Sequence, residues 1–103
     1  MGWTISHAPY GETIRRSATS ICNLGTQLAH VMPGRDWRLV RELFEPKPGD
    51  PFDVDWRRAG LIADALNLAA VHPLMPADWG ELARQIAAAA DTAAKNREPW
   101  HWS

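Results

Sequence analysis

Tryptophan stands at both ends of this chain. Trp3 lies near the start, Trp100 and Trp102 lie at the end, and the whole chain holds six tryptophans in 103 residues. Chain ends fray unless they are tied down, and an indole ring gains most when it is buried. Trp3 and Ile5 alternate with small polar residues, and Trp100 and Trp102 flank His101, which is the two-residue period of a strand. The sequence therefore predicts that residues 3–7 and 100–103 pair as an antiparallel ribbon.

Two helices are predicted in the first half. Apolar residues spaced by three and four predict a helix over 12–32, and Pro33-Gly34 ends it; this stripe comprises Ile14, Ala18, Ile21, Gly25, Leu28 and Met32. A shorter helix over 37–44 follows, with Asp36 as its cap. Residues 45–51 hold three prolines and predict a surface loop. Phe52 and Val54 share a face of a short extended segment that can add a third strand.

Two further helices are predicted in the second half. Asp55 or Asp53 caps a helix over 56–71, whose apolar residues cover so much of its circumference that a central position is expected. Pro76 and Asp78 open the fourth helix, where Asp78 and Glu81 have the spacing of a capping box. It ends before Pro99.

Together these segments predict one domain over residues 1–103. The class is mainly α (α+β): a compact four-helix domain with a small two- or three-stranded antiparallel ribbon that pairs the two terminal segments. The composition, 46% hydrophobic and 22% charged, is that of a globular protein.

Several classes of protein are disfavoured. Cys22 is the one cysteine, so no intramolecular disulfide can form, as is usual in the cytoplasm. The chain shows no signal peptide and no apolar run of the ~20 residues that span a membrane. The net charge is -1 and no basic block is present, so nucleic-acid binding is not expected.

Five segments carry a resemblance to a known family. They are residues 1–7, 28–37, 50–52, 72–79 and 100–103. On these segments the chain resembles a family of small actinobacterial proteins of unknown function. The resemblance implies no activity, because no catalytic signature lies in these segments. It implies a bacterial cytoplasmic or phage-derived setting.

Metal binding and catalysis are not indicated. The histidines are scattered rather than paired as zinc ligands are, although His7 and His101 can approach if the terminal strands pair; the four are His7, His30, His72 and His101. Asp50, Asp53 and Asp55 do not match a calcium loop and are explained by caps and turns. Cys22 lies beside an apolar stripe and is expected to be a small buried side chain. We therefore expect no metal, no cofactor and no enzymatic activity.

Arginine and tryptophan mark a candidate partner surface. They dominate the energetics of many protein interfaces, and here they gather in two segments: Arg35, Arg38 and Arg41 in the first, and Trp56, Arg57 and Arg58 in the second. Trp37 and Trp79 are expected in the core, and Trp56 is expected to be the most exposed. A solvated arginine face is the alternative.

The function predicted from these observations is a small non-enzymatic protein-interaction module, such as a bacterial or phage regulator or inhibitor. Its partner would be another protein or a second copy of the chain. The alternative is a small-molecule binding protein, with a tryptophan-lined pocket between the ribbon and the helices.

Overall fold

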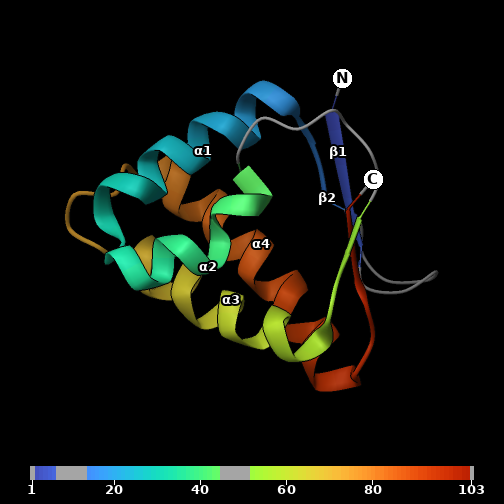
Figure 1. Cartoon of the computed structure of the whole chain (residues 1–103). Coiled ribbons are helices and arrows are strands. Elements are labelled where there is room, and N and C mark those ends of the chain that lie inside the picture. Colours follow the sequence, from blue (N-terminus) through green and yellow to red (C-terminus); the bar gives the residue numbers. More distant parts are fainter. Residues whose placement is uncertain (1, 7–13, 45–51, 103) are drawn as a thin grey trace.

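Four helices pack on one face of a four-stranded antiparallel sheet (Figure 1). The computed structural model describes residues 2–6, 14–44 and 52–102. The predicted class, a mainly helical domain whose sheet includes both terminal strands, is confirmed. The loop predicted over 45–51 lies outside the described residues, as does His7.

The sheet joins the two ends of the chain. Its order is β2-β1-β4-β3, with β1 at Gly2–Ser6, β2 at Ile14–Ser17, β3 at Phe52–Val54 and β4 at Trp100–Trp102. Ile5 lies opposite Trp102 across the two central strands, and Val54 lies opposite Trp100. The predicted pairing of the terminal segments and the predicted strand at 52–54 are therefore confirmed.

The prediction of a helix over 12–32 was wrong at its start. Residues 14–17 form strand β2, and helix α1 spans Ala18–Val31. Ile14 is the register partner of Ile5, so it belongs to the sheet and not to a helical stripe. One apolar residue followed by three polar ones fits either period, and hydrogen bonding along β1 decides for the strand. The sheet thus has four strands rather than two or three.

Helix α2 spans Gly34–Phe44 and begins three residues before the predicted start. The backbone N–H of Trp37 donates to the carbonyl of Pro33 at 2.9 Å, so the first turn already includes Asp36. The prediction that Asp36 is the cap was therefore wrong. Its carboxylate lies in the first turn, where negative charge favours the helix dipole.

A glycine sets the distance between α1 and α2. A Cβ added to Gly25 would lie 2.5 Å from the Cβ of Phe44, closer than two carbon atoms can approach. The absence of a side chain at Gly25 therefore lets the end of α2 pack directly on α1.

Helices α3, Trp56–Ala70, and α4, Ala77–Asn96, form an antiparallel pair. The side chain of Asp55 accepts the backbone N–H of Arg57, which confirms Asp55 as the cap of α3. The capping box predicted for α4 was wrong, because the cap is Pro76 and no side chain caps this helix; Asp78 lies within its first turn. Alanines fill the buried faces of both helices, so their backbones approach closely: Ala59, Ala63, Ala83, Ala87 and Ala90.

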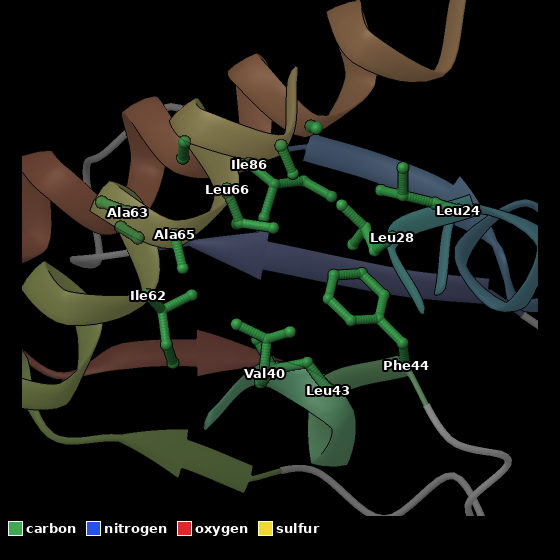
Figure 2. Close-up of a cluster of buried hydrophobic side chains, with 14 of the residues drawn as sticks. Leu24, Leu28, Val40, Leu43, Phe44, Ile62, Ala63, Ala65, Leu66 and Ile86 are labelled. Carbon is green, nitrogen blue, oxygen red and sulfur yellow. The ribbon is translucent and has the colours of Figure 1, made fainter. Parts of the chain in front are cut away.

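Both terminal tryptophans of β4 lie in the core. Trp100 and Trp102 are fully buried, with ring centroids 5.3 Å apart in an edge-to-face arrangement. Phe44 of α2 meets Trp102 edge-on at 6.2 Å, and Phe52 stacks on it at 5.6 Å. Figure 2 shows Phe44 among the aliphatic side chains of the helices. The alternation predicted for this strand is confirmed, because His101 between the two rings is only half-buried.

Candidate functional site

The largest exposed apolar side chains of the described residues lie on one element and the turn that follows it. They are Leu61, 59% exposed, Leu68, 68%, Val71, 71%, and Leu74, 76%. We call these four residues the α3 ridge. The first two lie on α3, and the others lie in the connection to α4.

The α3 ridge corrects one sequence prediction. Helix α3 has apolar residues around most of its circumference and was expected to be central. The structure buries only one face of it, on which Ile62 and Leu66 lie (Figure 2). Leu61 and Leu68 are two turns apart, so they share the opposite, outward face. Helix α3 therefore has two apolar faces, and only one of them is used inside the molecule.

Two opposite charges lie in line with the ridge. Arg57 precedes Leu61 by four residues, Asp64 follows it by three, and both are exposed. Neither side chain forms a salt bridge within the described part of the chain. The outward face of α3 thus combines a cation, a leucine, an anion and a second leucine, all open to solvent.

Trp56 lies at one end of this face, between two arginines from different helices. The guanidinium carbon of Arg57 is 4.8 Å from the centroid of its ring, and that of Arg97 is 5.6 Å away. Cation–π contacts of this kind contribute about 0.5–1 kcal/mol at exposed sites. Trp56 is half-buried, as Trp37 and Trp79 are, so its burial does not set it apart as the most exposed of the three. Two cations therefore lie against the ring at this end of α3.

Arg97 is the member of this cluster that sequence reasoning missed. It lies 41 positions after Trp56, and the sequence around it indicates only the end of a helix. It caps α4 in the left-handed conformation, with φ 53° and ψ 45°. The antiparallel packing places the end of α4 beside the start of α3: a Cβ on Gly60 would lie 3.3 Å from the Cβ of Ala94. Only that packing brings Arg97 to Trp56.

Arg58, a predicted interface residue, makes contacts inside the molecule. One terminal guanidinium nitrogen, Nη2, donates to the carbonyl of Leu39 at 3.2 Å and to the carboxylate of Glu42 at 3.3 Å. Both acceptors belong to α2. Arg58 is half-buried and joins α2 to α3, so much of its hydrogen-bonding capacity is already used.

The three arginines of α2 are exposed, but they do not converge. Arg35, Arg38 and Arg41 are three residues apart, so each is rotated about 60° from the last around the helix. The Nε of Arg38 donates to the carbonyl of Gly34 in its own helix. Arg58 hydrogen-bonds to α2 and so connects it with the start of α3. A single patch of all six predicted residues stays a prediction.

Trp37 and Trp79 each line a shallow hollow. One, of about 350 Å³, lies between α1 and α2, and its lining comprises Cys22, Gly25, Thr26, Ala29, His30, Trp37 and Phe44. The other, of about 380 Å³, lies beside Trp79 near the start of α4. Trp37 and Trp79 are half-buried and pack against the core. Cys22 is half-buried too, not fully buried as expected. Eight residues of α1, about 12 Å, separate it from His30, too far for a thiol–imidazole pair.

Two of the described histidines make polar contacts with other parts of the protein. His101 and Asp53 pair across β4 and β3 on the outer face of the sheet. The Nδ1 of His72 accepts the backbone N–H of Leu74 and so holds the end of the ridge. Within residues 2–6, 14–44 and 52–102, no three His, Cys, Asp or Glu side chains gather as a metal site requires. Among the helices described, none is both long enough and apolar enough to cross a membrane.

Comparison with known proteins identifies the family. A domain of unknown function, DUF7739, matches residues 8–103. The chain belongs to the DUF7739 family. No curated protein and no solved structure matches it. The DUF7739 match covers nearly the whole chain and brings no activity with it, so functional inference rests on the site itself.

Proposed function

We propose that this DUF7739 protein is a small non-enzymatic protein-interaction module that docks its partner on the outward face of α3. The observation that carries the proposal is the exposure of the α3 ridge. Scattered single apolar residues are normal on a surface, whereas contiguous apolar patches mark interaction sites. Four large apolar side chains, each more than half exposed, lie within 14 residues on one helix and its connection, which supports a docking role for this face.

The charged residues beside the ridge support the same proposal. Arg57 extends the ridge at one end, and Arg97 and Trp56 enlarge that end with a stacked cation and an aromatic ring. Tryptophan and arginine are the side chains most enriched where interfaces bind tightly. A role as a regulator or inhibitor, a cytoplasmic location and an actinobacterial or phage origin belong to this proposal as its biological setting.

The test substitutes the two ridge leucines that lie on α3 without disturbing the fold. The Leu61→Glu, Leu68→Glu double variant places two carboxylates on the outward face of α3. The matched control, Asn23→Glu with Ala88→Glu, adds the same charge at exposed positions of α1 and α4, away from the ridge. Circular dichroism verifies that both variants fold. Association is measured by sedimentation of the purified protein and by quantitative capture from the native host.

Wild type and control should associate with the same partner, whether a second copy or another protein, and the ridge variant should lose at least nine-tenths of that association. The proposal fails if the wild type associates with no protein in either measurement. It also fails if the ridge variant associates as strongly as the control does.

The hollow between α1 and α2 favours a second candidate function, the binding of a small aromatic molecule. Trp37 and Phe44 supply apolar walls, and Thr26 and His30 supply polar groups, as ligand sites commonly require. A thermal-shift screen of aromatic compounds tests it. A compound that stabilises the wild type but not an Ala29→Phe variant, in which the hollow is filled, supports this function. The absence of any such compound counts against it.

A further inference from the structure

We infer that the occupant of the α3 ridge is a second copy of this chain, with the two α3 helices packed antiparallel. This inference rests on the proposed function and names its partner. The outward face of α3 shows a helical seam: Arg57, Leu61, Asp64, Leu68 and Val71 follow each other by four, three, four and three residues. That alternation keeps one line of residues facing a neighbouring helix, as in coiled coils.

The charges on the outward face of α3 are complementary to those of a second copy of the same face. Arg57 and Asp64 lie seven residues apart, on either side of Leu61, and neither has a salt-bridge partner in the described part of the chain. When a second α3 runs antiparallel with the two-fold axis beside Leu61, Arg57 of each copy lies opposite Asp64 of the other. One symmetric contact then forms two identical ion pairs, as a self-complementary dimer interface requires.

The same charges disfavour the parallel arrangement. Parallel helices in register would place Arg57 opposite Arg57 and Asp64 opposite Asp64, and like charges at these positions repel. Antiparallel packing replaces both repulsions with attractions. The charges therefore determine the direction of the helices, while the leucines supply the apolar contact.

The leucines fit this arrangement. The Leu61 side chains of the two copies meet beside the axis. Leu68 lies about 11 Å from the two-fold axis, measured along the helix. At that level it is less than one helical turn from Trp56 of the second copy, whose ring is half-buried. Leu68, Val71 and Leu74 all lie beyond the start of the other α3, and of these only Leu68 comes near it, beside Trp56 of the second copy.

The small size of the contact predicts a weak dimer. With the axis beside Leu61, only residues 56–65 of the two helices overlap, ~15 Å of each, so the shared face is roughly 150 Å². Stable complexes bury about 800 Å² on each partner. Self-association should therefore depend on concentration, and it should be sought up to about 1 mM rather than at trace amounts.

The test is a charge swap on the intact protein. Arg57→Asp and Asp64→Arg each convert both ion pairs into like-charge pairs, so each variant alone should self-associate at least tenfold more weakly than the wild type. An equimolar mixture of the two variants should form the heterodimer, because every facing pair is then opposite in charge. The double variant, Arg57→Asp with Asp64→Arg, should dimerise like the wild type. Ala88→Arg, at an exposed position of α4 away from the seam, is the control for added charge.

Analytical ultracentrifugation measures self-association, and capture of an untagged variant by a tagged one measures the heterodimer. Recovery in the mixture and in the double variant supports the inference. A monomeric wild type at every concentration overturns it, as do single variants that dimerise normally or a swap that restores nothing. A monomer that still captures another protein through the ridge overturns only this inference and leaves the proposed function standing.

Discussion

Ile5 and Trp102 lie opposite each other in adjacent strands, although they are 97 positions apart in the sequence. Both side chains are fully buried between the sheet and the helices. The last strand is therefore part of the hydrophobic core. Its removal should lower the stability of the whole domain.

Deletion of residues 100–103 should lower the melting temperature strongly or prevent folding. The smaller change Trp102→Ala should cost about 3–5 kcal/mol of unfolding free energy, because it leaves a cavity among packed aromatic rings. Urea denaturation monitored by circular dichroism measures the cost. His101→Gln is the control: it alters an outward, partly exposed pair with Asp53 and should cost at most about 1 kcal/mol. Equal stability of Trp102→Ala and wild type would contradict the burial of this strand.

Two glycines should respond in opposite directions to alanine. Gly25→Ala should destabilise the protein by about 1–3 kcal/mol, because the new methyl group collides with Phe44 and forces α1 and α2 apart. Gly34→Ala should be neutral or stabilise by up to about 1 kcal/mol, because nothing lies within 4 Å of the added Cβ and alanine favours the helix. Denaturant midpoints compare them. The packing of α1 on α2 is refuted if both variants have the stability of the wild type.

At position 97, replacement of arginine by glycine should destabilise the protein less than replacement by alanine. Its backbone is left-handed, a conformation that costs residues with a Cβ about 1 kcal/mol and costs glycine little. Both Arg97→Gly and Arg97→Ala lose the same contact with Trp56, so their difference isolates the backbone term. We expect Arg97→Gly to be the more stable variant by about 1 kcal/mol in chemical denaturation. The reverse order would show that α4 does not end in this conformation.

The sequence predicted the elements that carry strong local patterns. Alternating tryptophans identified the terminal strands, and Asp55 identified the start of α3. Residues 14–17 were misassigned because Ile14 fits a helical stripe and a strand equally well, and the partner that decides between them, Ile5, lies on another segment. A local sequence pattern cannot decide between helix and strand when the decision depends on pairing with a distant segment.

The candidate site was predicted only in part, for the same physical reason. The Trp56-Arg57-Arg58 segment was recognised, but periodicity alone could not tell that Arg58 bonds to α2 or that Arg97 stacks on Trp56. The exposure of Leu61 and Leu68 was also missed. From its sequence, a helix with two apolar faces is predicted to be buried on all sides. Only the packing of the neighbouring elements shows which face remains exposed to solvent.

Arg58 should behave as a structural residue rather than as an interface residue. Arg58→Leu removes its bonds to Leu39 and Glu42 and should lower the unfolding free energy by about 1 kcal/mol. A double-mutant cycle with Glu42→Gln should give a coupling of about 0.2–1 kcal/mol, as expected for a partly exposed pair. Arg35→Ala, at an exposed position of α2, should leave stability unchanged. A cycle with no coupling would show that the link between α2 and α3 is not formed.

The double reversal Arg38→Glu with Arg41→Glu separates the arginine surface of α2 from the α3 ridge. Both side chains are exposed and lie on a helix face away from the buried Val40, Leu43 and Phe44, so the fold should survive by circular dichroism. An acidic protein partner that uses this surface should bind at least tenfold more weakly, because attraction becomes repulsion and steering is lost. Self-association through α3 should be unchanged in the same sample, since Leu61, Arg57 and Asp64 are untouched. If the reversal abolishes self-association instead, then α2 and not α3 forms the contact between copies.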